Sequence, residues 1–294
     1  MDYIIYIVLR GAIAFFNALP HSLALSLGRL MAALVYALMP FRRRMVMENI
    51  KKAFGDKLSD AEVLSIVKSF YSKLGMSVAE VARLKSFGPE YFSSHVEFEG
   101  NEHADAALKQ GKGVVFLSAH FGNWELLSAA LALKGYRMTA VARPIDNKHV
   151  NRYLETVRRA FGTSIIEKEN ALRKMIELLK SGGILGILLD QRSSRREGVE
   201  VDFFGAMAYT NKGLAALVQR TGSPVVPVFM RRIGTDKHRV MFGKPVEVVS
   251  TGDREAYIIE NTARFAKAIE KFIALYPDEW FWFHSRWERK KYRR

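Results

Sequence analysis

The chain begins with two apolar stretches, over residues 3–19 and 23–39. Each falls slightly short of the about 20 residues that a helix needs to cross the hydrocarbon of a bilayer, and each carries polar residues at helical spacing. Arg29 lies within the second stretch and would cost about 2.5 to 3.5 kcal/mol at the bilayer midplane. We therefore expect two helices that lie in the membrane interface. A single crossing and a buried helical hairpin of a soluble protein are the alternatives.

A basic cluster follows these stretches. Arg42, Arg43 and Arg44 are adjacent, and basic residues beside an apolar segment favour the cytoplasmic side and anionic lipid. Residues 1–45 are accordingly predicted to form helices that anchor the chain to a membrane. The remainder, residues 46–294, is predicted to be a globular domain on the cytoplasmic face.

The hydrophobic pattern of the remainder predicts its fold. Apolar positions three or four apart over residues 59–85 predict helices, so residues 46–95 are assigned as a helical lead-in. Farther on, short apolar runs alternate with amphipathic stretches. Strands are predicted at 114–117, 138–142, 184–189 and 225–230, and helices at 124–133, 150–160, 171–179 and 214–219. Residues 96–294 are therefore predicted to form an α/β core, a mostly parallel central sheet covered by helices.

The charge of the chain indicates an anionic partner. Lys and Arg number 45 against 30 Asp and Glu, a formal net charge of +15, which suits anionic lipid, an acidic carrier protein or nucleic acid. The aromatic run 280–283 and Trp287 stand beside the basic residues of 289–294. This mixture suits a lipid interface, although nucleic-acid proteins use the same residue types. Cysteine is absent, which excludes disulfides, thiolate metal sites and a cysteine nucleophile.

One segment carries recognisable chemistry. His120 directly follows an apolar run, so it is expected at the carboxyl end of a parallel strand, where α/β sheets bind ligands. Glu125 lies five residues on, about 140° around an ideal helix, so the two can meet only with His120 in the turn and Glu125 in the first helical turn. A carboxylate there would fix one imidazole tautomer and stabilise the imidazolium. Such a pair can deprotonate a hydroxyl.

Several motifs, in order, are similar to those of one family. The His-x4-Glu spacing of residues 120–125 resembles the His-x4-Asp/Glu signature of the lysophospholipid acyltransferase superfamily, and more narrowly that of the lipid A biosynthesis acyltransferases, also called lauroyl and myristoyl acyltransferases. Six further segments resemble the same family: Ala-Arg-Pro at 142–144, Leu-Leu-Asp-Gln at 188–191, Val-Asp-Phe-Phe-Gly at 201–205, Thr-Asn-Lys-Gly at 210–213, Gly-Ser-Pro-Val-Val-Pro at 222–227 and Tyr-Pro-Asp-Glu-Trp at 276–280. The resemblance covers most of the chain.

The resemblance implies an activity. It implies transfer of an acyl chain from acyl carrier protein to a hydroxyl of a lipid A precursor, without a metal or an organic cofactor. It also implies a glycerolipid acyltransferase-like fold, with residues 46–294 as the catalytic domain, at the inner membrane of a bacterium. Carried over by position, His120 is the general base, Glu125 its partner, Arg143 a contact to the acceptor or the thioester, and Asp190 a residue that holds the loop or binds the acceptor.

Three more residues complete the predicted substrate contacts: Asn123, Gln191 and Lys212. Gln191 opens a basic loop that suits phosphates or an acidic carrier, and Lys212 precedes a predicted helix start, where backbone N–H groups favour anions. The plainer alternative for the basic loop is a solvated face of the protein. His149 and His284 lack partners at metal-ligand spacing, and we assign them no role.

Other functions are also compatible with the residues. The acceptor could be another glycolipid such as a mannosylated phosphatidylinositol, an aminolipid or a lysophospholipid. A basic adaptor for membranes or nucleic acid, without catalysis, would explain the net charge but not the His-x4-Glu segment. We expect no nucleic-acid partner, because no nucleic-acid motif accompanies the charge.

Overall fold

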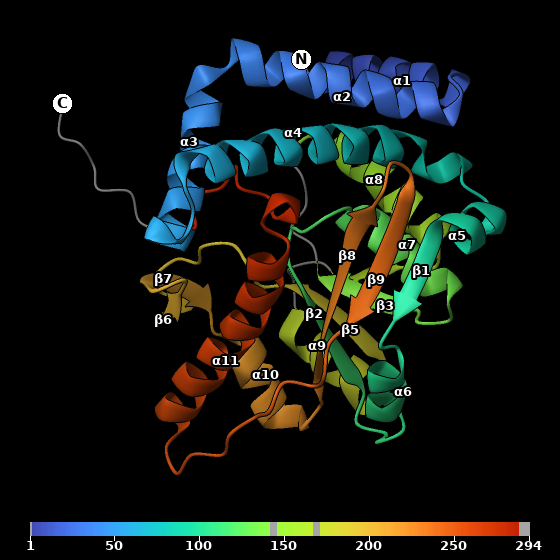
Figure 1. The fold of residues 1–294 in the computed structure, drawn as a ribbon. Coiled ribbons are helices and arrows are strands. Elements are labelled where there is room, and N and C mark those ends of the chain that lie inside the picture. The colour runs from blue at the N-terminus through green and yellow to red at the C-terminus, as the bar shows by residue number, and fades with distance from the viewer. Residues whose placement is uncertain (1, 142–145, 167–170, 288–294) are drawn as a thin grey trace.

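The fold was determined as a computed structural model, which describes residues 2–141, 146–166 and 171–287 (Figure 1). Arg143 and the basic residues of 289–294 lie outside this range. A seven-stranded sheet with the order β1-β9-β8-β2-β5-β3-β4 forms the centre. Its strands are β1 (Val96–Glu99), β2 (Val114–Ser118), β3 (Met138–Val141), β4 (Ser164–Ile166), β5 (Ile184–Leu188), β8 (Val225–Ile233) and β9 (Lys237–Phe242).

The sheet is mostly parallel, which confirms the predicted fold class. Strands β4, β3, β5, β2 and β8 pair in parallel, whereas β9 runs antiparallel to β8 and pairs in parallel with β1. All five residues of β2 are buried, as expected for a central strand covered on both faces. The four predicted strands correspond to β2, β3, β5 and β8.

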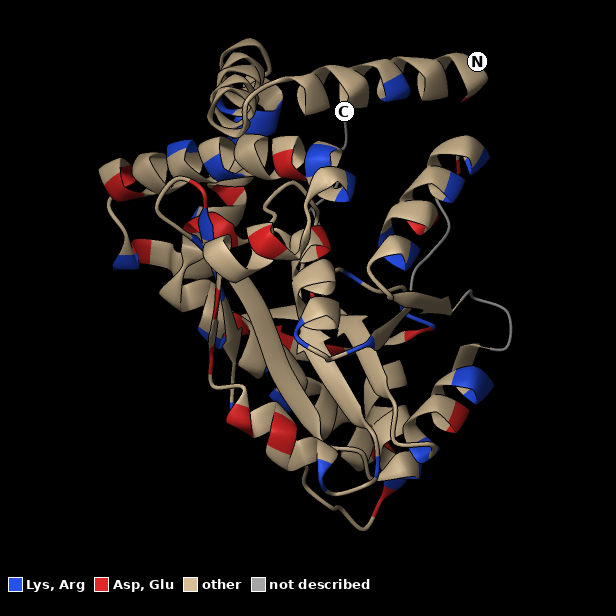
Figure 2. Cartoon of the chain, turned by 90° about the vertical axis from the view of Figure 1, so that its right-hand side faces the viewer, with Lys and Arg blue, Asp and Glu red and all other residues tan. Residues whose placement is uncertain are grey.

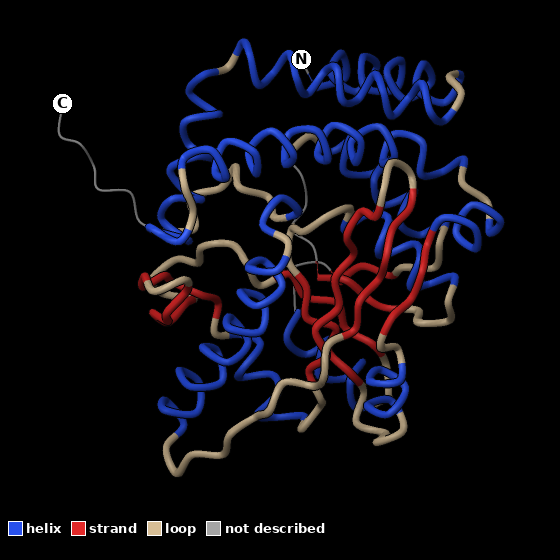
Figure 3. The backbone as a smooth tube through the Cα atoms, viewed as in Figure 1, coloured by secondary structure: helices blue, strands red, loops and turns tan. Residues whose placement is uncertain are grey.

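Helices cover both faces of the sheet (Figure 3). Val115 and Leu117 of β2 point into the core formed with α4, α9, α10 and α11, while Phe116 points into the core formed with α5, α6 and α7. The helix bounds are α4 (Asp60–Arg83), α5 (Pro89–His95), α6 (Glu102–Leu108), α7 (Trp124–Leu133), α8 (Lys148–Ala160), α9 (Ala171–Lys180), α10 (Gly213–Thr221) and α11 (Arg254–Leu275). The hairpin of β6 (Gly198–Phe203) and β7 (Ala206–Asn211) forms a separate two-stranded sheet.

Helices α1 (Asp2–Ala18) and α2 (His21–Leu38) lie on the outer side of α4, and α3 (Pro40–Phe54) leads back to the core (Figure 1). The backbones of α2 and α4 approach closely, since a Cβ added at Gly28 would lie 2.4 Å from the Gly75 carbonyl oxygen. Figure 2 shows few charged residues along α1 and α2. Among the described residues, one helix, His21–Leu38, is long and apolar enough to cross a membrane.

The outer surface of α1 and α2 is apolar. Exposed hydrophobic side chains lie along both helices and continue into α3, namely Tyr3, Ile4, Ile5, Ile7, Val8, Phe15, Leu23, Leu30, Met31, Leu34, Val35, Leu38, Met39 and Phe41. Patches of this kind on soluble proteins mark interaction surfaces. We call this set the outer apolar face. The assignment of residues 1–45 as a membrane anchor remains a prediction.

The aromatic residues near the C-terminus do not form a lipid-facing belt, contrary to one expectation from the sequence. Trp280, Trp282 and Trp287 are buried in the main core. Trp280 and Trp287 pack against Phe203 of the β6–β7 hairpin. These aromatic residues therefore hold the last part of the chain against the β6–β7 hairpin.

Candidate active site

A short loop after β2 carries His120 and is held in place by backbone contacts. Gly122 has a φ of +56°, and a Cβ there would lie 1.9 Å from the Met230 carbonyl oxygen, so only glycine fits. The Gly122 N–H donates to the Glu279 carbonyl at 2.8 Å, and the Phe281 N–H donates to the His120 carbonyl at 2.8 Å. The loop is thus fixed between β8 and the segment that follows α11.

The imidazole of His120 is paired with a buried carboxylate, that of Asp190. His120 Nδ1 lies 2.9 Å from Asp190 Oδ1. Asp190 is fully buried, and its Oδ2 accepts a hydrogen bond from Trp280 Nε1 at 2.8 Å and lies 3.6 Å from His284 Nε2. Burial alone would raise the pKa of Asp190, but hydrogen bonds and charge attraction from His120 and His284 outweigh it and hold this pKa well below the usual range.

This arrangement selects one tautomer of His120. An ionised carboxylate can only accept hydrogen bonds, so Nδ1 of His120 donates to Asp190. The lone pair of the neutral ring is then on Nε2, which lies 3.3 Å from the amide nitrogen of Gln191. A histidine in this state can accept a proton at Nε2, and Asp190 stabilises the imidazolium that results.

Glu125 is not the hydrogen-bond partner of His120, which corrects the pairing expected from the sequence. Its carboxylate accepts two hydrogen bonds from Arg158 of α8, from Nε at 2.9 Å and from Nη2 at 2.5 Å. Glu125 lies in the first turn of α7, and that turn directs it towards α8. A catalytic role of Glu125 stays a prediction. Such a role would not depend on direct contact with the imidazole of His120.

Asp190 meets His120 because of the register of two parallel strands. Ser118 of β2 pairs with Leu188 of β5, so the residues two positions beyond each strand end, His120 and Asp190, come together. Asp190 was predicted as a loop or substrate residue, and its actual partner lies 70 positions earlier in the sequence. Only knowledge of the strand pairing would have revealed this contact.

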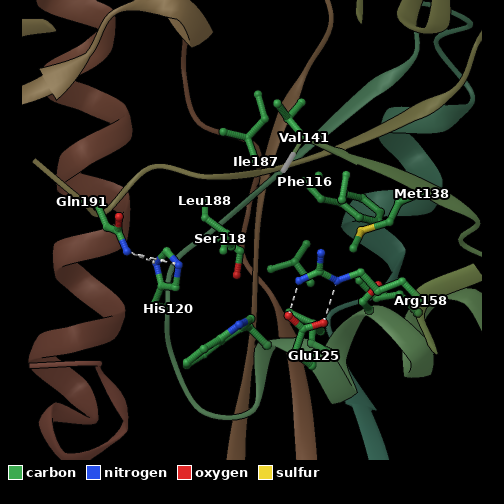
Figure 4. A pocket seen from close by; sticks show the side chains of 17 residues that line it. Phe116, Ser118, His120, Glu125, Met138, Val141, Arg158, Ile187, Leu188 and Gln191 are labelled. Atoms are coloured by element: carbon green, nitrogen blue, oxygen red, sulfur yellow. Dashed lines mark hydrogen bonds and ion pairs between the residues drawn. The ribbon is translucent and has the colours of Figure 1, made fainter. Parts of the chain in front are cut away.

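His120 lies at the edge of a cavity of about 430 Å³. Figure 4 shows His120 and Gln191 on one side of it, Glu125 and Arg158 on the other, and Ser118 between them in this view. The remainder of the wall is mostly apolar and includes Phe116, Leu127, Leu131, Met138, Ala140, Val141, Ile187, Leu188 and Val228. An elongated apolar group with a polar end suits such a cavity.

Asn123 does not line the cavity, contrary to its prediction as a substrate contact. It is only 2% exposed, its Oδ1 accepts from the Leu126 N–H at 3.1 Å to cap α7, and its Nδ2 donates to Glu80 Oε2 at 2.9 Å. Glu80 also binds Arg232 and His238. Burial would raise the pKa of Glu80, but these two partners lower it to about 2, so the carboxylate is ionised at neutral pH. The amide of Asn123 thereby ties the start of α7 to α4.

The other predicted substrate contacts differ in whether they reach the cavity. Gln191 is exposed beside the imidazole and lines the cavity, as a substrate contact would. Lys212 is exposed at the start of α10, where its role is still a prediction. The structure does not describe Arg143. Among the described residues, no group of His, Asp and Glu is arranged to hold a metal ion.

Three residues of the site were not predicted: Arg158, Trp280 and His284. Arg158 lies in a helix with several basic residues, and no local pattern distinguishes it. Trp280 belongs to a segment that resembled the family, which was the one available signal, and His284 lacked any partner close in sequence. All three act through contacts between distant segments.

Comparisons with known proteins agree with the resemblance seen in the sequence. The family model described as bacterial lipid A biosynthesis acyltransferase matches residues 1–289. The lipid A biosynthesis myristoyltransferase of Escherichia coli (strain K12) is 24% identical over 82% of this chain and 73% of its own length. The lauroyltransferase of the same strain is 26% identical, over 92% and 87%. A phosphatidylinositol mannoside acyltransferase of Mycobacterium tuberculosis is 27% identical over 64% of this chain and 58% of its own length.

Proposed function

Because the chain belongs to the bacterial lipid A biosynthesis acyltransferase family, we propose that it transfers a fatty acyl chain from an acyl carrier protein thioester to a hydroxyl of a lipid A precursor. The observation that carries this proposal is the hydrogen bond of His120 to buried Asp190 at the edge of a largely apolar cavity. The apolar cavity can hold the acyl chain, and the imidazole can take the proton of the acceptor hydroxyl.

The reaction proceeds by direct attack on the thioester. Nε2 of His120 takes the proton of the acceptor hydroxyl as the oxygen attacks the carbonyl carbon. Asp190 stabilises the imidazolium formed in this step. The tetrahedral intermediate then expels the thiolate, which receives the proton from His120. The proton taken from the acceptor hydroxyl ends on the thiol, and His120 is neutral again. The reaction therefore needs no covalent intermediate with the enzyme and no cofactor.

Glu125 and Arg158 form the polar wall opposite His120. The two parallel hydrogen bonds of Glu125 fix the guanidinium of Arg158 in one orientation. A fixed cation near the reacting carbonyl stabilises negative charge that develops there. In this proposal Glu125 contributes by orienting Arg158, while Arg143, Gln191 and Lys212 remain candidate contacts for the donor or the acceptor.

The outer apolar face supports a membrane location, at the cytoplasmic face of a bacterial inner membrane. Its hydrophobic side chains are exposed over α1 and α2, and Arg42, Arg43 and Arg44 follow directly. An apolar surface with adjacent arginines suits an anionic bilayer, from which a lipid acceptor can reach the site.

Neutralising the three arginines is expected to weaken membrane binding. The triple variant with Arg42, Arg43 and Arg44 replaced by glutamine should bind vesicles of phosphatidylglycerol and phosphatidylethanolamine on the order of 100-fold more weakly, since each arginine near the surface contributes about 1 kcal/mol. Sedimentation with vesicles measures this. Glutamine at the exposed residues Lys244, Arg254 and Lys271 is the matched control. Equal weakening in the control would show that only total charge matters.

Mass spectrometry tests the proposed activity. Purified protein is incubated with acyl carrier protein thioesters and a tetra-acylated lipid A precursor, and a mass gain of one acyl chain is expected. A mannosylated phosphatidylinositol and a lysophospholipid serve as parallel acceptors, because one relative acts on the former class by name. No gain on any acceptor, together with oligonucleotide binding that falls steeply with salt, would favour the adaptor.

A further inference from the structure

Ser118 is the last residue of β2 and has an unusual environment. It is only 7% exposed and lines the cavity beside His120. Among the described residues, its Oγ has no hydrogen-bond partner, and it is the only buried polar atom in this condition that belongs to the cavity wall. A buried hydroxyl without a partner destabilises the folded protein, whereas alanine at this position would not.

The hydroxyl is placed where the reacting carbonyl would lie. Phe116 and Ser118 lie on one face of β2, where successive side chains are about 6.6 Å apart, and His120 follows in the loop directly after the strand. All three line the cavity. In the proposed reaction, the acyl chain packs among the apolar residues near Phe116. Its carbonyl carbon must lie within reach of the acceptor oxygen, which is hydrogen-bonded to His120 Nε2. The carbonyl group then lies beside Ser118. Figure 4 shows the Ser118 hydroxyl between His120 and the Glu125–Arg158 pair.

We propose that Ser118 is a catalytic residue whose hydroxyl donates a hydrogen bond to the carbonyl oxygen of the acyl donor. This inference rests on the proposed function. When the acceptor oxygen bonds to the carbonyl carbon, the π electron pair moves to the carbonyl oxygen, and the Ser118 O–H stabilises the resulting oxyanion. The pair returns as the carbon–sulfur bond breaks, and the thiolate takes the proton from His120. Ser118 itself forms no covalent bond.

Ser128 provides a matched comparison. It is a serine of α7 with the same 7% exposure, and it lines the same cavity. Its Oγ, however, lies 2.8 Å from Thr163 Oγ1, so its hydrogen bond is made within the protein. Loss of the Ser128 hydroxyl therefore removes a structural contact, while loss of the Ser118 hydroxyl removes only a contact to the substrate.

The first experiment compares turnover and stability. Ser118→Ala is expected to lower kcat about 100-fold and to raise KM only a few-fold, because the hydrogen bond to the ground-state carbonyl is weak and strengthens in the transition state, and to unfold at the same or a higher temperature. Ser128→Ala should unfold at a lower temperature. An unchanged kcat in Ser118→Ala would overturn the proposal. It would indicate that the hydrogen-bond partner of the hydroxyl is a bound water and not the substrate. Loss of kcat together with loss of stability would also overturn it.

The second experiment does not depend on the acceptor. Calorimetry compares binding of a lauroyl-pantetheine thioester with that of a dodecyl-pantetheine thioether, which lacks the carbonyl. Wild type and Ser128→Ala should prefer the thioester, and Ser118→Ala should bind both equally. The same preference in all three proteins would overturn the role of Ser118 while leaving the proposed function intact. Failure of wild type to bind either compound and to transfer an acyl chain would overturn both.

Discussion

Replacement of His120 with alanine is expected to lower the rate of acyl transfer by about 10³-fold while the protein remains folded. The loss follows because the variant has no base at the position where the acceptor hydroxyl must release its proton. The fold should survive, because the His120 side chain is 22% exposed and Asp190 retains the hydrogen bond from Trp280. Turnover at saturating substrate and unfolding followed by circular dichroism measure the two effects.

Replacement of a histidine outside the cavity shows whether loss of any histidine lowers the rate. His103 lies in α6, outside the residues that line the cavity, and His103→Ala should retain the wild-type rate. Normal turnover in His120→Ala would refute the assignment of His120 as the base.

Asp190→Asn is expected to have an effect of similar size, a loss of about 10³-fold in kcat. The amide retains the size of the carboxylate but loses its charge, and its NH₂ group can donate to Nδ1, which favours the wrong imidazole tautomer. The imidazolium also loses its anionic partner, so the acidic limb of the pH dependence of kcat/KM should move to lower pH. Steady-state kinetics over a pH series measure both changes.

Glu125→Gln is the matched change at the other carboxylate. Because Glu125 binds Arg158 and not the imidazole, this variant should lose rate without moving the acidic limb. A shift of the limb in Glu125→Gln, with none in Asp190→Asn, would restore the pairing that the sequence suggested.

The hydrophobic pattern predicted the central strands and the amphipathic helices that cover them. The continuous apolar run of β2 was recognised because all five of its residues are buried, and that of β5 because its apolar residues enter the core or line the cavity. The β6–β7 hairpin was not recognised as a hairpin. Its Gly205 has a positive φ, but the adjacent Phe204 also does, a conformation that few non-glycine residues adopt. The motif at residues 201–205 thus contains a turn that its composition concealed.

The candidate site was predictable only to the extent that its contacts are local. His120 and Glu125 were found from their spacing, and both line the cavity. Their partners, Asp190 and Arg158, come from segments 70 and 33 positions away. Helical geometry constrains which residues of one segment can share a face, but it says nothing about a neighbouring strand. Pairing of β2 with β5 supplied the missing carboxylate.

The C-terminal aromatic residues illustrate how one composition serves two environments. Tryptophan beside lysine and arginine is typical of a membrane interface. Here Trp280 is buried and its indole N–H donates to Asp190, so the residue supports the site. An indole buried with its N–H satisfied is equally consistent with the physical preferences of tryptophan, and the sequence alone offers no means to separate the two.

The proposed mechanism depends on the hydrogen bond between His120 and Asp190, and the tautomer of His120 reports on this bond. Nitrogen-15 NMR of protein labelled in histidine, with the His120 signals assigned by their absence in His120→Ala, reports which ring nitrogen bears the proton. We predict a proton on Nδ1 in wild type and in Glu125→Gln, and loss of this preference in Asp190→Asn. A proton on Nε2 in the wild-type protein, or a tautomer that changes in Glu125→Gln but not in Asp190→Asn, would show that Asp190 does not set the tautomer of His120.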